Sequence, residues 1–278
     1  MKKHIILFAS LLFSAALANA QTLKTPSASP STTIKQDFAL SNIELSYSRP
    51  SVKGRNIFGD LVPYGKVWRT GANSATTISF GEEVSINGTK VKAGKYGILT
   101  IPEAGEWTII ITKQLDVTSP AAYKAEQDVV RVKVPVTSLP FSVENFTIMI
   151  GNIASGSCEV WFIWDNTMVA LPISADVESQ VMQQIDRVMN NDNRPYFSAA
   201  MYYLDNNKDL NKALEWFNKA AETDPKAYWV QFRKADCLAK LGRKQEAIAT
   251  AEKSLALARE AKNEDYVKLN EDLIKKLK

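Results

Sequence analysis

Hydrophobic and polar residues alternate along the chain from about residue 37 to residue 173. Apolar side chains stand at every second position in segments such as 107–111 and 146–150, and this period of two places them on one face of a strand. Asn87-Gly88 separates two short alternating runs, which predicts a two-residue hairpin with a type I′ turn. About eight short strands with no helical segment between them predict a mainly β antiparallel sandwich, jelly-roll-like, over residues 37–173.

The pattern changes to a helical period after Pro172. Ala213, Phe217, Ala220 and Pro225 have the spacing of the second helix of a tetratricopeptide unit, and Ala247 stands 34 residues after Ala213. Ala251 lies where an aromatic residue matching Phe217 is expected, and Gly242 fits a helix C-cap. Residues 174–278 are therefore predicted to form an all-α helical-repeat (TPR-like) domain, which either binds a protein partner in its groove or only caps the fold.

The first residues have the pattern of a secretory signal peptide. A basic start is followed by an apolar run to Leu17 and by Ala18-Asn19-Ala20, an A-x-A cleavage site. The apolar run is shorter than the ~20 residues that cross a bilayer, so a membrane anchor is disfavoured and no transmembrane segment is expected. No cysteine lies near the cleavage site, so a lipoprotein is not expected. We predict cleavage after residue 20, a flexible linker over residues 21–36, and a periplasmic or extracellular location reached through the general secretory pathway.

Composition and charge narrow the possible functions. The 278 residues are 45% hydrophobic and 23% charged, as in a globular protein with a real core. Removing Lys2 and Lys3 with the signal peptide lowers the formal net charge from +4 to +2, which gives no reason to expect a nucleic acid partner. Cleavage also removes His4, the single histidine. Histidine-based catalysis and histidine-containing metal sites are thereby excluded, and no catalytic residue, metal site or cofactor is predicted.

Two cysteines, Cys158 and Cys237, remain after cleavage. A disulfide is possible in an oxidising compartment, but it would join the two predicted domains. Cys158 shares a strand face with Val160 and Phe162, and Cys237 lies within a helical pattern. We favour two small buried apolar residues over a disulfide.

The segment between Tyr47 and Asn73 is the longest part of the β domain without alternation. It contains five cations and one acidic residue, with aromatic side chains among them. Long irregular loops often carry function, arginine binds anions in two-point contacts, and aromatic faces stack on sugars or cations. One interpretation is a binding site for an anionic glycan or a peptide carboxylate. In this site Trp68 would stack on the ligand and the Asn73 amide would orient it. The cations that would contact its anionic group are Arg49, Lys53, Arg55 and Arg69. The alternative is a structural loop fixed by its own Arg–carbonyl hydrogen bonds, with Trp68 filling the end of the sandwich.

The same segment carries a family resemblance. The run from Ser48 to Asn73, continuing through Ala75-Thr76-Thr77-Ile78, closely resembles the signature of DUF2911, a secreted bacterial family of unknown function. The segments 92–96, 107–110 and 164–167 resemble it too, and the likeness covers residues 37–173. The resemblance implies a fold and a compartment, and related proteins often carry tetratricopeptide-like helices after this domain. The family has no assigned activity, so the resemblance implies no mechanism.

Three functions are compatible with these observations. The first is a non-enzymatic, extracytoplasmic binding or adaptor protein whose β domain holds an anionic or sugar-like ligand and whose helical tail engages a protein partner. The second is a carbohydrate-active hydrolase that uses carboxylates, for which Glu82/Glu83 and Glu103/Glu106 are the nearest pairs. The third is a purely structural envelope protein that assembles through the helical tail.

Overall fold

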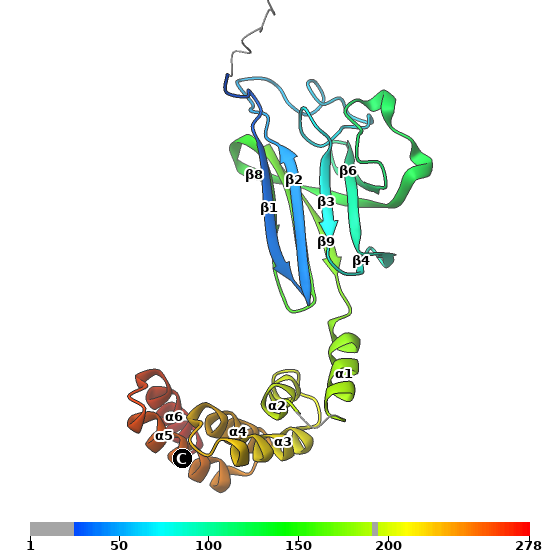
Figure 1. Ribbon diagram of the computed structural model, residues 1–278. Helices are drawn as coiled ribbons and strands as arrows, with labels where there is room; N and C mark the ends of the chain where they lie inside the picture. Colours follow the sequence, from blue (N-terminus) through cyan, green and yellow to red (C-terminus); the bar gives the residue numbers. More distant parts are fainter. Residues whose placement is uncertain (1–24, 191–193) are drawn as a thin grey trace, which may run out of the picture. The chain divides into compact units, whose positions relative to one another are not determined.

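The computed structural model describes residues 25–190 and 194–278, which divide into two compact units (Figure 1). The first unit extends to Val177 and the second begins at Glu178. The predicted signal peptide, residues 1–20, lies outside the described residues. No helix within the described ranges is long and apolar enough to cross a membrane.

In its described residues the first unit contains nine strands hydrogen-bonded in one antiparallel order, β1-β2-β3-β6-β7-β8-β9-β4-β5. The strands are β1 (Ser31–Phe38), β2 (Ser41–Ser48), β3 (Thr76–Phe80), β4 (Val84–Ile86), β5 (Thr89–Val91), β6 (Gly94–Pro102), β7 (Glu106–Thr112), β8 (Asp128–Gly151) and β9 (Ser157–Ser174). The predicted class, a mainly antiparallel β domain followed by helical repeats, is confirmed.

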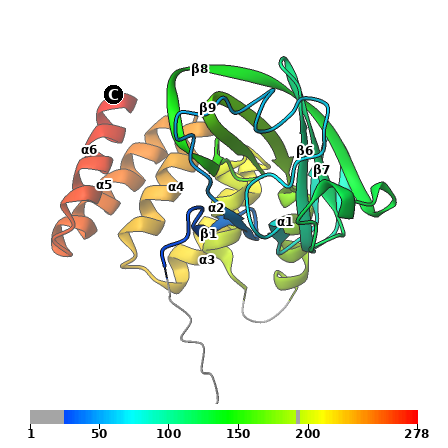
Figure 2. The same ribbon diagram turned by 90° about the horizontal axis from the view of Figure 1, so that it is seen from above.

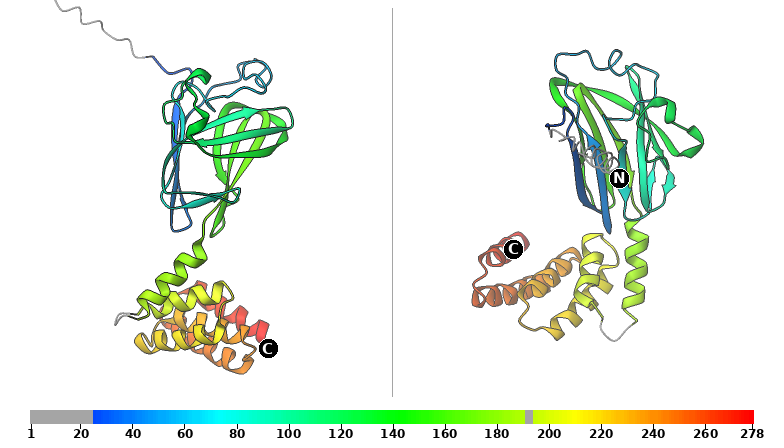
Figure 3. Two further views of the ribbon diagram at one scale, coloured as in Figure 1. Left: turned by 90° about the vertical axis from the view of Figure 1, so that its right-hand side faces the viewer. Right: turned by 45° about the horizontal axis from the view of Figure 1, so that its top comes forward.

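The long strand β8 connects the two halves of this sheet. Its residues 128–135 pair with β7, and its residues 136–151 pair with β9, with two shifts of register between Ser138 and Thr147. The strands wrap around one core, to which β2, β3, β6, β7, β8 and β9 all contribute buried side chains (Figure 3). The buried Tyr47 hydroxyl of β2 accepts a hydrogen bond from the Ile148 N–H of β8 at 2.9 Å and donates one to the Ile148 carbonyl at 3.1 Å.

The Asn87-Gly88 hairpin forms as predicted. Ile86 of β4 faces Thr89 of β5, and the two residues between them have positive φ angles of 49° and 78°. A type I′ turn requires positive φ at both central positions, which asparagine and glycine adopt at low cost.

The predicted flexible linker is wrong for residues 31–36, which form most of β1. All eight residues of β1 pair with β2, from Ser31 opposite Ser48 to Phe38 opposite Ser41. Ile34 packs against the core while its neighbours in sequence are exposed. The alternation was hidden because β1 is an edge strand whose other inward-facing residues are mostly Thr and Gln.

The second unit consists of helices. They are α1 (Val177–Val188), α2 (Tyr196–Asp205), α3 (Leu210–Thr223), α4 (Tyr228–Lys240), α5 (Lys244–Glu260) and α6 (Glu264–Leu277). Helices α2 and α3 form the first repeat, α4 and α5 form the second, and α6 packs on α5 (Figure 2). Gly242 ends α4 with a φ of 74°, and the next N–H, that of Arg243, reaches back to the Leu238 carbonyl at 2.9 Å. This is a Schellman C-cap, as its position predicted.

The missing aromatic residue of the second repeat has a structural explanation. Phe217 is fully buried in the core of the first repeat, where its ring lies 6.1 Å from that of Phe197. At the matching position of the second repeat, Ala251 lies in a cluster with Ala235 of α4 and Ile274 of α6. A side chain from α6 thus packs at a position that a phenylalanine would otherwise occupy.

Both cysteines are free and buried, so the prediction of two small core residues is confirmed. Burial raises the pKa of the Cys158 and Cys237 thiols to about 11. At pH 8 only on the order of one thiol in a thousand is then ionised, and the thiolate is the reactive form.

We therefore expect neither thiol of the native chain to react with Ellman's reagent within minutes at pH 8. Unfolding in guanidinium without reductant should expose two reactive thiols per chain. An unfolded chain that still lacks reactive thiols would instead contain a disulfide.

Candidate functional site

The segment that follows β2 is fixed to the sheet by Arg49. The guanidinium Nε donates to the Phe146 carbonyl at 3.2 Å, and Nη2 donates to the Thr147 hydroxyl at 2.8 Å. Ser51 continues this contact by forming an isolated antiparallel bridge with Asn145. Arg49 therefore anchors the beginning of the segment to β8.

The other two arginines also donate to carbonyl oxygens of the chain. Arg55 donates from Nε to the Val52 carbonyl at 3.0 Å and from Nη2 to the Ser51 carbonyl, which closes a turn. Arg69 donates from Nη1 to the Thr118 carbonyl at 3.0 Å, in the connection between β7 and β8. Its Nε is buried without a hydrogen-bond partner among the described residues.

Lys53 and Asn73 are exposed and have positive φ angles of 48° and 57°. The backbone N–H of Lys53 donates to the Glu144 carboxylate at 3.0 Å, so its backbone is fixed while its side chain is exposed. The Asn73 amide donates to the Ser29 carbonyl at 3.0 Å. Both residues serve as turn positions, for which asparagine is well suited and lysine is not.

Trp68 packs into a group of aromatic rings at one end of the sheet. Its ring stacks on that of Trp164 at 5.8 Å with an interplanar angle of 16°, and its indole N–H donates to the Gly71 carbonyl at 3.2 Å. The backbone of Trp68 bridges to Thr100 of β6. The remaining rings of this aromatic cluster are those of Phe58, Trp107 and Phe146.

The hydrogen bonds and ring contacts required by the structural interpretation are therefore present. Arg49 and Arg55 hold the segment to β8 and to its own turn, whereas Arg69 reaches the connection after β7. Binding of an anionic or sugar-like ligand by these six residues stays a prediction.

The carboxylate pairs lie at the surface. Glu83 and Glu106 form ion pairs with Lys90 and Lys133, all four with side chains well exposed, and Glu82 accepts a hydrogen bond from the Leu40 N–H. Among the described residues no group of three or more metal-binding side chains is close enough to hold an ion.

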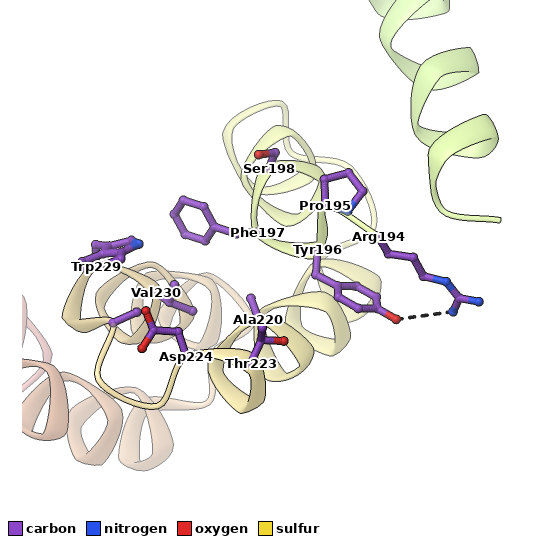
Figure 4. Close-up of a pocket in the computed structure, with 11 residues that line it drawn as sticks. Arg194, Pro195, Tyr196, Phe197, Ser198, Ala220, Thr223, Asp224, Trp229 and Val230 are labelled. Atoms are coloured by element: carbon purple, nitrogen blue, oxygen red, sulfur yellow. Dashed lines mark hydrogen bonds between the residues drawn. The ribbon is translucent and has the colours of Figure 1, made fainter. Parts of the chain in front are cut away.

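The helical unit contains a hollow that sequence reasoning missed. Its volume is about 280 Å³, and it lies between the beginning of α2, the end of α3 and the beginning of α4. Figure 4 shows the side chains that line this apolar hollow; they include Tyr196, Phe197, Ala220, Trp229 and Val230. Trp229 is 38% exposed, an unusual position for a large aromatic side chain.

Polar groups surround the apolar hollow. Arg194 donates to the Tyr196 hydroxyl at 3.4 Å, and the Asp224 carboxylate accepts from the Lys226 N–H at 3.2 Å. The signal that could have revealed this hollow is Trp229 itself, because it stands beside the buried Val230 rather than on the buried face of α4.

Comparisons with known proteins cover both units. The family model described as a protein of unknown function (DUF2911) matches residues 29–173, and a tetratricopeptide repeat model matches residues 194–226 and 230–260. No curated protein matches the chain. A crystal structure of a tetratricopeptide repeat domain protein from Salinibacter ruber is 23% identical, with a TM-score of 0.28, over 30% of this chain and 91% of that one. The predicted order, a DUF2911 domain followed by tetratricopeptide repeats, is confirmed.

Proposed function

Since the chain belongs to the DUF2911 family and carries tetratricopeptide repeats after that domain, we propose that it is a non-enzymatic adaptor whose helical repeats bind a protein partner. Tetratricopeptide arrays use their stacked helices as binding surfaces, and the repeats indicate a role in protein–protein interaction. The DUF2911 family itself is of unknown function.

The observation that carries this proposal is the exposed Trp229 in the apolar hollow. Tryptophan is enriched among the residues that dominate binding energy, and such residues contribute most where a partner covers them completely. Trp229, Phe197 and Val230 offer an apolar surface, with Arg194 and Asp224 beside it. This composition suits an apolar side chain of the partner, flanked by backbone or polar groups that bind at the rim.

The proposal includes an extracytoplasmic location. It is supported by the basic start, the apolar run and the A-x-A site in residues 1–20. Fractionation of cells that produce the full chain tests this part, with recovery of a chain that begins at Gln21 outside the cytoplasm as the expected result.

Replacing Trp229 by alanine tests the binding function. We expect recovery of the partner by affinity capture from an extract of the producing cells to fall about tenfold or more, because a central aromatic contact is lost. Trp229 contacts the Tyr228 ring at 5.0 Å but is partly exposed, so the melting temperature should change by no more than about 2–4 °C.

Phe141→Ala is the matched control, since Phe141 is 61% exposed on β8 of the other unit. This variant should capture the partner as well as the unmodified chain does. Loss of capture with Phe141→Ala, and normal capture with Trp229→Ala, would place the partner on the β unit and contradict the proposal.

A further inference from the structure

A second depression, here called the polar groove, lies on the helical unit between α3 and α5. Helix α4 forms its floor, and its volume is about 440 Å³. In contrast to the apolar hollow, it is lined by polar side chains from three helices: Asn218, Glu222, Gln231, Lys234, Thr250 and Lys253. The hollow is lined by Ala220 and Val230 and the groove by Ala221 and Gln231, so the two lie on different sides of the α3–α4 contact.

The floor of the polar groove contains the side chain of Gln231. Gln231 is only 3% exposed and lines the groove. Within residues 25–190 and 194–278, its side chain forms no hydrogen bond. Its amide is not among the buried polar atoms that lack a partner, so it is open to the groove, where its N–H groups can donate to a ligand.

Two lysines give the polar groove an excess of positive charge. Neither Lys234 nor Lys253 forms an ion pair with another described residue. Burial lowers the pKa of Lys234, and the charge of Lys253 lowers it further. The other charges that act on Lys234 largely oppose one another, since Glu246 and Glu222 favour its charged form and Arg243 disfavours it.

We infer that the polar groove binds a carboxylate of an acidic segment in the protein partner, an inference that rests on the proposed function. Two ammonium groups and the Gln231 amide provide hydrogen-bond donors from the floor and one wall of the groove, and a carboxylate oxygen accepts such bonds strongly. Glu222 lies on the opposite wall and repels a doubly charged phosphate more than a singly charged carboxylate. An acidic peptide is therefore the occupant that the charges favour.

The test measures binding of fluorescein-labelled hexaglutamate to the full chain by fluorescence anisotropy at low salt. The double variant Lys234→Gln, Lys253→Gln should bind at least about tenfold more weakly, because it loses two charge-assisted contacts. The control Lys268→Gln, Lys276→Gln removes the same charge from exposed positions of α6 and should bind within about twofold of the unmodified chain.

Nuclear magnetic resonance provides a second measurement that reports on the groove directly. Addition of hexaglutamate should shift the side-chain amide signals of Gln231, and hexaglutamine should not. Equal weakening by the two double variants, or an unchanged Gln231 signal, would overturn the inference, because binding would then follow net charge alone. Displacement of hexaglutamate by equimolar inorganic phosphate would also overturn it.

The experiment separates this inference from the proposed function. Trp229→Ala should leave hexaglutamate binding unchanged, because Trp229 does not line the polar groove. If Trp229→Ala abolishes partner capture and the groove variant leaves hexaglutamate binding intact, the carboxylate site is refuted while the adaptor function stands. If hexaglutamate binds in the groove but Trp229→Ala does not reduce capture of the partner, the carboxylate site stands while the adaptor function fails.

Discussion

Replacing Trp68 by alanine is expected to lower the free energy of unfolding of the β unit by about 3–4 kcal/mol. The substitution removes a ring that stacks on Trp164 and meets three further rings edge-on, and it leaves the Gly71 carbonyl without the indole N–H. Loss of this one ring from the aromatic cluster leaves a cavity that the neighbouring strands close only in part, since β6 and β8 are fixed by their ladders.

Differential scanning calorimetry of the full chain measures this effect. The transition of the β unit should move down by roughly 10 °C, at about 2–4 °C per kcal/mol for a unit of this size. The control Trp68→Phe keeps a ring in the aromatic cluster, and its transition should move down by clearly fewer degrees than that of Trp68→Ala. A shift below about 2 °C would contradict the structural role and favour a ligand-binding role for Trp68.

Replacing Phe217 by alanine is expected to have an effect of similar size on the helical unit, about 3–5 kcal/mol. Phe217 is fully buried and packs between α2 and α4, with its ring edge-on to Phe197. Phe197 also lines the apolar hollow, so the substitution should weaken partner capture as well.

Urea denaturation followed by far-ultraviolet circular dichroism at 222 nm measures the loss for the helical unit. The control Phe217→Leu keeps most of the side-chain volume and should cost under about 1.5 kcal/mol. A small decrease in the free energy of unfolding for Phe217→Ala would mean that the first repeat tolerates a small residue at this position although no side chain from a further helix fills the space. That outcome would contradict the packing account, in which Ala251 is tolerated because Ile274 packs beside it.

Periodic positions allowed much of the fold to be predicted from the sequence. Strands such as β7, in which Trp107, Ile109 and Ile111 are buried, follow from a period of two. The 34-residue offset between Ala213 and Ala247 identified the repeats, because both positions face a neighbouring helix where only a small side chain fits. Strand β1 was missed because its inward-facing side chains are mostly polar and depend on β2 for their pairing.

The functional surfaces were harder to predict for a physical reason. The positions of the arginines are visible in the sequence. The oxygens that Arg49, Arg55 and Arg69 bind are backbone carbonyls, which every residue has, so no sequence pattern identifies them. The apolar hollow and the polar groove each combine residues from three helices. Their chemistry depends on which faces of α3 and α4 remain uncovered, and a repeat pattern alone does not specify this.

The length of β8 has a consequence for how the β unit comes apart. Both halves of the sheet pair with β8: β7 pairs with its first part, and β9 pairs with its second part. Separation of one half exposes unpaired N–H and carbonyl groups on a strand that still belongs to the other half, so partial opening is penalised. We therefore expect the β unit to unfold as one cooperative block.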